Sequence, residues 1–286
     1  MVEIGKKVCI ASILFIAVAA GVSSVSAQDY PDTLWIPVTF YDYLSNPPSL
    51  NPDFENCNNG LEEGLVKDEL NDLKRPVPDT NADLSKYEFY DCHANLIQWY
   101  TPGDPISYDS SDYNYETNRW KNDANLVEWD PSAYTHPDPD LNNYDFPAVE
   151  PGDSMYVSAD FDINDPMACV VIYDSLPFLH RGEGVYEFIR NDDDQFFWLD
   201  NRGFGDEGRE HNYSFAMELH TTFIKSPGLT FSFLGDDDVW AFVDNELAMD
   251  LGGVHAQKDG SFNVDDLGLE DWNEYQFDFF YAERHT

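Results

Sequence analysis

Residues 231–255 read FSFLGDDDVWAFVDNELAMDLGGVH, with two apolar runs on either side of three consecutive acids. Residues 229–233 alternate between apolar and polar side chains, which is the period of a half-buried strand. Residues 239–243 are β-branched or aromatic and end at the turn signal 244–245, so they predict a second strand. The tight turn of this predicted hairpin carries three acids whose charges repel one another: Asp236, Asp237 and Asp238. Either solvent surrounds this turn, or the turn holds a hard cation.

Short strands also predominate in the rest of the chain. Apolar or alternating runs of strand length, separated by turn residues, occur at 34–43, 95–100, 167–173, 186–189, 196–199, 212–223 and 275–281. Residues 61–74 differ, because their apolar positions recur close to helical spacing between a possible cap, Asn59, and a helix terminator, Pro76. The predicted fold is therefore mainly β, an antiparallel β-sandwich or barrel with long loops and one N-terminal helix.

The N-terminus has the pattern of a secretory leader. Lys6 and Lys7 precede an apolar run over residues 8–20, which is short for a membrane span. The small residues 25–27 then precede Gln28, as at a signal-peptide cleavage site. We expect residues 1–27 to be a signal peptide and the mature chain to be secreted without a membrane span. The alternative is an uncleaved anchor.

Acidic residues dominate the charge. The chain has 55 Asp and Glu against 15 Lys and Arg, a formal net charge of −40. Such a surface repels phosphate backbones and anionic lipids, which argues against nucleic acid and membrane-surface partners. It suits divalent cations and neutral partners such as sugars, although acidity also serves solubility alone.

Three cysteines lie outside the leader: Cys57, Cys92 and Cys169. An oxidising compartment allows one disulfide, and Cys57–Cys92 is the predicted pair because both residues lie in the N-terminal region. The cysteines form no CxxC pattern, which argues against a zinc site.

Several motifs occur in an order that resembles a known family. They are Phe204-Gly205 and residues 211–222, 233–243, 250–255 and 282–286, preceded by 38–42 and 52–55. Together they resemble the fibro-slime domain, which is related to the PA14 β-barrel or sandwich. The likeness covers most of residues 35–286 and is weakest between about 100 and 165. It implies an N-terminal fibro-slime region at 28–127 and a PA14-like β-domain at 128–286.

The resemblance also implies a calcium site. In sugar-binding PA14 relatives, two adjacent aspartates of the acidic turn hold a calcium ion that coordinates glycan hydroxyls. Asp236 and Asp237 match those two positions, and Asp238 stands where many relatives have glycine. The remaining ligands of those relatives have no match here. The family pattern continues past Thr286, so a closing strand and part of the metal shell are unaccounted for within the 286 residues.

Other residues are candidates for supporting roles. Asp250 and Asn263 carry oxygens that calcium accepts, so they are candidates for further ligands. His255 follows two glycines and could contact a ligand or serve the structure, and Trp240 could stack on a sugar or be buried by strand alternation. Asn212-Tyr-Ser214 is an N-glycosylation sequon, which is meaningful only in a eukaryotic secretory pathway.

Two functions follow from these patterns. The first is a secreted or cell-surface carbohydrate-binding or adhesion module, assisted by calcium through the Asp-Asp turn. The alternative is an extracellular matrix or signalling protein that binds another protein, with a purely structural acidic turn. The chain carries no nucleophile elbow, HExxH or phosphate-binding loop, and chance carboxylate pairs are expected in so acidic a sequence. We therefore expect that it is not an enzyme.

Overall fold

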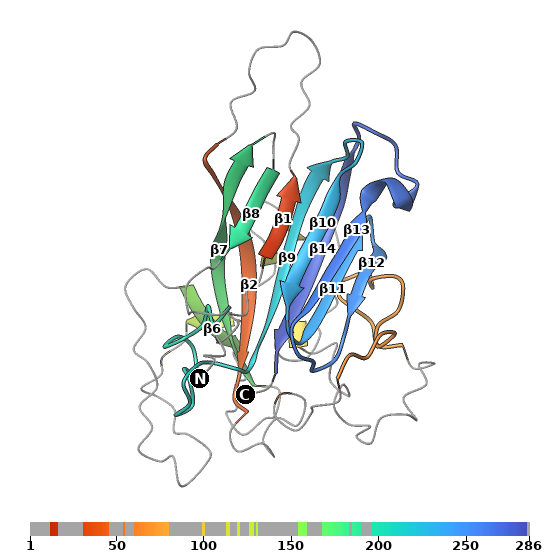
Figure 1. The fold of residues 1–286 in the computed structure, drawn as a ribbon. Helices are drawn as coiled ribbons and strands as arrows, with labels where there is room; N and C mark the ends of the chain where they lie inside the picture. The colour runs from red at the N-terminus through yellow and green to blue at the C-terminus, as the bar shows by residue number, and fades with distance from the viewer. Residues whose placement is uncertain are drawn as a thin grey trace, which may run out of the picture.

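Antiparallel strands dominate the computed structural model (Figure 1). The structure describes residues 12–16, 31–45, 54, 60–79, 99–100, 113–114, 119–120, 126–128, 130, 154–158, 168–182, 185–189 and 196–284. The mainly β, antiparallel class that the sequence predicts is confirmed. The predicted Cys57–Cys92 pair lies outside the described residues, and Cys169 is buried. No helix in the described part of the chain is long and apolar enough to cross a membrane.

One large sheet forms the main layer. Its path runs β1-β8-β7-β2-β9-β14-β11-β12, and β6 joins β5 to β7. Its strands are β1 (Ser12–Ile16), β2 (Thr33–Tyr43), β5 (Leu126–Glu128), β6 (Ser154–Ser158), β7 (Cys169–Gly182), β8 (Val185–Ile189), β9 (Phe215–Ile224), β11 (Asp238–Val243), β12 (Glu246–Leu251) and β14 (Glu274–Glu283). Because β2 lies between β7 and β9, the expected regions 28–127 and 128–286 both contribute to this sheet.

Two short sheets and a helical turn complete the described elements. Strand β10 (Thr230–Gly235) pairs with β13 (Lys258–Asn263), and β3 (Tyr113–Asn114) pairs with β4 (Arg119–Trp120). The 3₁₀ helix η7 (Val264–Leu267) follows β13. Strand β10 packs on β14 of the large sheet, since the rings of Phe231 and Phe277 stack with centroids 4.5 Å apart. The β10–β13 pair therefore forms a second layer over the large sheet.

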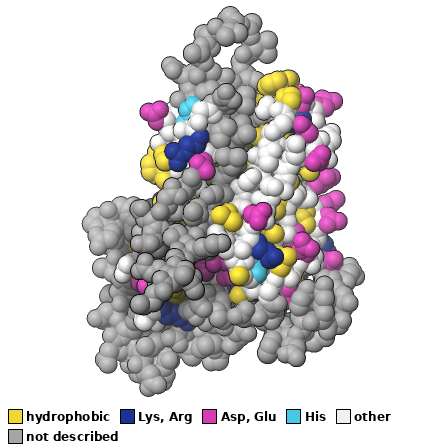
Figure 2. All heavy atoms as spheres, viewed as in Figure 1, with side chains coloured by type: hydrophobic (Ala, Val, Ile, Leu, Met, Phe, Trp, Pro, Cys, Tyr) yellow, Lys and Arg dark blue, Asp and Glu magenta, His cyan; other side chains and the backbone are white. Residues whose placement is uncertain are grey.

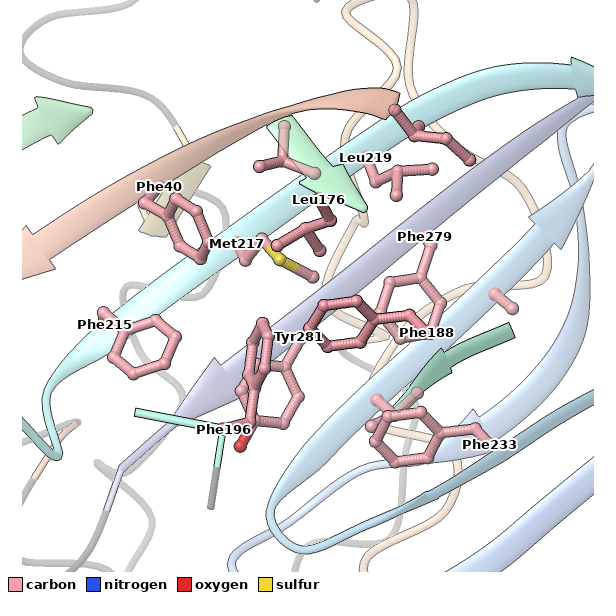
Figure 3. Close-up of a cluster of buried hydrophobic side chains, with 14 of the residues drawn as sticks. Phe40, Leu176, Phe188, Phe196, Phe215, Met217, Leu219, Phe233, Phe279 and Tyr281 are labelled. Carbon is pink, nitrogen blue, oxygen red and sulfur yellow. The ribbon is translucent and has the colours of Figure 1, made fainter. Parts of the chain in front are cut away.

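The main core lies between these layers. Alternation turns every second side chain of β9 and β14 toward it, so that Phe215, Met217, Leu219, Phe279 and Tyr281 are all buried (Figure 3). Aromatic rings fill much of this space, in the edge-on and tilted contacts that their quadrupoles favour.

A second apolar cluster covers the opposite face of the large sheet. It contains Tyr41, Trp240 and Phe280 from the sheet, with Trp99 and residues of the 60–79 segment above them. The large sheet is thus buried on both faces at its centre. Strand β11 accordingly reads as a nearly continuous apolar run after Asp238 and is buried at every position.

Two sequence-based predictions of secondary structure are wrong. The 61–74 segment is not a helix but a series of turns, with isolated bridges Val66↔Pro78 and Glu69↔Glu246. Leu65, Val66 and Leu70 do become buried, but Gly60 and Gly64 adopt positive φ values of 85° and 86°, outside the helical region. Residues 196–199, predicted as a strand, lie in a bend and turn that bury Phe196 and Leu199.

Candidate functional site

The acidic turn connects the two layers. Strand β10 ends at Gly235 and β11 begins at Asp238, yet β10 pairs with β13 whereas β11 pairs with β12 and β14. The predicted hairpin is therefore wrong, because the turn passes from the second layer to the large sheet. Asp237 adopts a left-handed φ of 59°, which Asp tolerates better than most residues. Gly235 has no room for a side chain, since a Cβ there would lie 2.4 Å from the ring of Phe233.

Asp238 is bound by groups of the protein itself. Its side chain is completely buried, and Arg284 Nε donates to its Oδ2 at 2.5 Å. The backbone N–H of Gly253 donates to the other oxygen at 2.6 Å. The Arg284 guanidinium lies 4.8 Å from the centre of the Trp99 ring, a cation–π distance. Arg284 therefore supplies the positive charge for Asp238, and both carboxylate oxygens of Asp238 have partners.

The carboxylate charge of Asp237 is less fully compensated than that of Asp238. It is 4% exposed, and its Oδ2 accepts the backbone N–H of Arg284 at 2.9 Å. Burial raises the pKa of Asp237 to about 8, and the charges of Asp236 and Asp238 add to this although Arg284 opposes it. At neutral pH Asp237 therefore keeps its proton, unless a cation takes the place of that proton.

Glu283 adds a further carboxyl to this site. It ends β14 on the same face as Tyr281 and is 6% exposed. The Tyr281 hydroxyl donates to its Oε2. Burial raises the pKa of Glu283 well above its usual range, and the charges of Asp237 and Asp236 raise it further. The sequence carried a signal for this residue, because a charged side chain at a core-facing position of an alternating strand is unusual.

A hard cation prefers oxygen ligands such as the carboxyls of Asp236, Asp237 and Glu283. These three groups are, however, not already arranged as a metal site. Calcium takes carboxylate, carbonyl and water oxygens, and a cation here would offset the burial and the repulsion that raise the pKa values of Asp237 and Glu283. Within the described ranges, however, no three His, Cys, Asp or Glu side chains already stand as a metal-binding group. A bound ion would therefore need backbone carbonyls or waters as well.

The two further ligands that the sequence suggested do not join this site. Asp250 accepts hydrogen bonds from the N–H groups of Gly64 and Gly252 and from Trp240 Nε1, at 2.6, 3.1 and 3.0 Å, so it fastens the 60–79 segment to the sheet. Asn263 pairs with Thr230, at the end of β10 opposite the acidic turn. Five residues of strand separate the two ends, about 16 Å at the usual rise. Asn263 instead caps η7 by accepting the N–H of Asp265.

Neither ligand-binding candidate presents its ring to solvent. Trp240 is 0% exposed, so no sugar can stack on it in this structure. His255 is 7% exposed, and its Nε2 and Nδ1 lie 3.2 and 3.0 Å from the carbonyl oxygens of Leu251 and Ala256. Its backbone carbonyl accepts the N–H of Asp237 at 3.4 Å. His255 thus supports the acidic turn through its backbone.

The sequon residue Asn212 is structural as well. It is 2% exposed, and its Nδ2 donates to Asp42 Oδ1 at 2.7 Å. The backbone N–H of Phe204 donates to Asp42 Oδ2 at 2.5 Å, so Asp42 ties the 196–214 segment to β2. A glycan on Asn212 would have no access to solvent at this buried position, which argues against glycosylation of the folded chain.

A second cluster of titratable groups lies on the other face of β9 and β14. His220 Nδ1 lies 2.7 Å from Asp278 Oδ1, and its Nε2 lies 3.3 Å from Glu218 Oε2. Arg75 Nη1 bonds to the same Glu218 oxygen at 2.8 Å, and Tyr41 donates to Glu218 Oε1 at 2.8 Å. All five side chains are at most 3% exposed. This network holds Arg75 of the 60–79 segment against the sheet.

Comparison with known proteins finds relatives among the psi proteins of Dictyostelium discoideum. Protein psiN of Dictyostelium discoideum is 34% identical over 249 residues, which cover 84% of this chain and 27% of psiN. Protein psiJ of the same organism is 31% identical over 265 residues, or 87% of this chain and 29% of psiJ. Protein psiR is 43% identical over 106 residues, or 32% of this chain and 11% of psiR. The chain thus has homologues among the psi proteins and spans less than a third of their length.

The other two comparisons found nothing similar. No protein-family model matches the chain. No solved structure matches it either.

Proposed function

We propose that this chain is a secreted, calcium-assisted carbohydrate-binding or adhesion module of the fibro-slime kind, related to the PA14 domain. In this proposal residues 1–27 are removed as a signal peptide, and the mature chain binds a glycan or a surface protein outside the cell. The chain acts by binding and carries out no catalysis. The motifs in residues 204–222 and 233–255, quoted above, support the choice of family.

The crowding of acids at the β10–β11 turn is the observation that carries the calcium assignment. Asp237 and Glu283 are both nearly buried, and each has its pKa raised by burial and by repulsion from neighbouring acids. A protein that needed these acids only for solubility would keep them in water, where they cost little. Buried carboxylates are expected to be paired or to bind a metal ion.

Asp236, Asp237 and Glu283 would hold the ion. When bound, calcium supplies open coordination positions that sugar hydroxyls can fill. The chain's own residues do the positioning: the salt bridge between Arg284 and Asp238 fixes the start of β11, and the carbonyl of His255 fixes the N–H of Asp237. In this proposal the carboxylate ligands are Asp236, Asp237 and Glu283, whereas Asp238 has a structural role.

Thermal melting in calcium tests the metal site. A ligand that binds only the native state at 100 times its Kd stabilises it by about 2.7 kcal/mol, which raises Tm by roughly 5–10 °C in a domain of this size. We expect Asp237→Asn to lose most of this rise while its metal-free form melts at or above the wild-type temperature, because the neutral amide removes repulsion. Asp266→Asn is the matched control, since Asp266 is an exposed acid beyond the far end of β10.

Glycan binding with and without a chelator tests the rest of the proposal. The wild-type chain should bind at least one glycan on an array in calcium, and both chelator and Asp237→Asn should abolish that signal. A calcium-induced rise in Tm with no glycan signal would support the metal site and contradict the assignment as a carbohydrate-binding module. No rise in Tm at any calcium concentration would remove the metal site.

The alternative function has one observation in its favour. Arg284 and the N–H of Gly253 already occupy both oxygens of Asp238, so part of the acidic turn is held without a metal. This favours an extracellular matrix or signalling protein that binds another protein, with a structural turn. Replacing Asp236 and Asp237 together by Ala, with folding and binding unchanged, would support this alternative.

A further inference from the structure

The position of β1 in the fold carries a further inference. Ser12–Ile16 runs antiparallel to β8 in continuous register, from Ser12↔Ile189 to Ile16↔Val185. These residues belong to the apolar run at 8–20 that we propose is removed with the leader. The segment that completes this part of the sheet is thus the segment that secretion would remove.

Strand β1 stands between β8 and β10 (Figure 1). Cα atoms of β1 and β10 approach within 8 Å, although the only ladder of β10 among the described strands is with β13. Strand β1 lies one ladder spacing, about 4.7–4.9 Å, from β8 and within 8 Å of β10, so its loss leaves a gap about one strand wide between them.

Such a gap would open over the main core. Tyr186 and Phe188 of β8 and Phe231 and Phe233 of β10 are each at most 4% exposed. Phe188 contacts Phe196, and Phe233 contacts Phe279, each with ring centroids 5.7 Å apart (Figure 3). Without β1, apolar rings and the unpaired backbone edge of β8 would meet water, which is the usual signature of a strand-accepting site.

We propose that, once the leader is removed, this gap binds an extended, uncharged apolar segment of another extracellular protein, which adds as a strand beside β8. The segment whose backbone pairs there, Ser-Ile-Leu-Phe-Ile, is extended and uncharged. Among the described strands of a second copy, β8, β12 and β13 would each have a ladder on one side only once β1 is absent, but each contains charged residues, whereas Ser12–Ile16 contains none. Backbone pairing gives affinity in this mode of recognition, and alternate side-chain pockets give specificity.

This inference rests on the secretion part of the proposed function and is independent of calcium. The first measurement is N-terminal sequencing of the protein secreted by a eukaryotic host. A mature chain that begins near Gln28 is required. Retention of residues 12–16 would overturn the inference, because the chain would then fill its own gap. Calcium titration of the same sample reports on the metal site separately.

A disulfide trap then tests the register. Leu14 and Glu187 are paired across β1 and β8, and the Glu187 side chain makes only an exposed ion pair with Arg181, so Glu187→Cys is expected to fold. The mature variant is mixed with a peptide of residues 10–18 that carries Leu14→Cys, with lysines added at both ends for solubility. We expect a mixed disulfide at position 187, mapped by mass spectrometry. The matched control peptide carries Ile16→Cys in place of Leu14→Cys; its thiol would face position 185, too far from 187 to be bridged.

Three outcomes decide the inference. A disulfide that forms with the Leu14→Cys peptide and not with the Ile16→Cys peptide supports it. Equal reaction of both peptides, or of neither with a folded mature chain, overturns it. A mature chain that is a dimer and becomes a monomer when the unmodified peptide is added would make a second copy the occupant, and would overturn the assignment to another protein.

Discussion

At the scale of single residues, the ion pair between Arg284 and Asp238 decides how the acidic turn is held. Both side chains are 0% exposed, and the partners lie 46 positions apart in the sequence. Removing one partner of a buried pair leaves the other charge without compensation, which typically costs about 3–5 kcal/mol. We expect Arg284→Met to lose stability of that order in urea unfolding. Arg181→Met removes an exposed pair with Glu187 and should cost less than about 1 kcal/mol. Equal losses in the two variants would show that the buried pair has no special role.

Asp237 makes stability depend on pH. Its pKa in the folded state is about 8, against an ordinary value of 3.8. The folded chain therefore binds this proton more tightly than the unfolded chain, and the resulting stabilisation is complete below about pH 3.8 and is lost as the pH rises through about 8. In chelator, we expect Tm to fall between pH 5 and pH 8, and less so in Asp237→Asn. Calcium binds the ionised form, so its effect on Tm should be larger at pH 8 than at pH 5. A rise of the chelator Tm over this range would contradict the assignment.

His220 adds a pH dependence of the same sign. Burial lowers the pKa of His220, but its hydrogen bonds to Asp278 and Glu218 outweigh burial, so the pKa is raised overall. The stabilisation is present below the unfolded pKa of about 6.5 and is lost as the pH rises through the folded value. We expect His220→Gln to flatten the fall of Tm above pH 6.5, as measured by calorimetry. His211→Gln, which removes a partly exposed imidazole 2.7 Å from Asp200, is the matched control. Identical slopes in wild type and His220→Gln would contradict the role of His220.

At the scale of elements, local sequence patterns predicted the strands, but they did not predict the contacts between residues that are distant in the sequence. The alternation at 212–223 and 275–281 gave β9 and β14, and the Asp244-Asn245 signal gave the turn between β11 and β12, where both residues have positive φ. The apolar spacing at 61–74 was misleading, because Leu65, Val66 and Leu70 are buried by contacts with distant strands rather than along a helix face. Arg284 and Glu283 escaped notice as parts of the site because their partners are set by the pairing of β11 with β14.

The docking of the 60–79 segment on the β12 end depends on glycine. A Cβ at Gly253 would lie 2.3 Å from the carbonyl oxygen of Gly60, and Gly253 also has a φ of 94°. Gly228 has a comparable φ of 78° but nothing within 4 Å of its Cβ position. Gly228→Ala should therefore cost about 1–2 kcal/mol for the left-handed backbone alone. Gly253→Ala should cost about 1–3 kcal/mol more, because it also forces the two segments apart. Equal losses in chemical denaturation would mean that the two segments separate freely.

At the scale of the whole molecule, the acidic surface and the shared sheet set what the chain can do. Figure 2 shows Asp and Glu side chains along the side of the molecule that carries β12 and β13. Exposed acids there and in the following turn include Glu246, Asp259, Asp265, Asp266, Glu270 and Asp271. We still expect that nucleic acids are not partners of such a surface. The acids near the β10–β11 turn differ from these exposed acids because they are buried, so they need a separate explanation.

The sheet predicts that the β-rich second half of the chain cannot fold alone. Strand β2 lies between β7 and β9 and buries Ile36, Val38, Phe40, Tyr41 and Tyr43. Their burial contributes roughly 8–15 kcal/mol at about 1.5–3 kcal/mol for each side chain. A typical domain has only about 5–15 kcal/mol of net stability, so the loss of β2 removes about as much free energy as stabilises the whole fold.

We expect a chain of residues 128–286 to show no cooperative melting and no near-ultraviolet circular dichroism, whereas residues 28–286 should show both. Adding a peptide of residues 31–45 to the truncated chain should restore part of the signal, because the peptide supplies the strand with which β7 and β9 pair. Cooperative melting of residues 128–286 by themselves would mean that β2 is an accessory strand, and that the domain boundary near residue 127 is real.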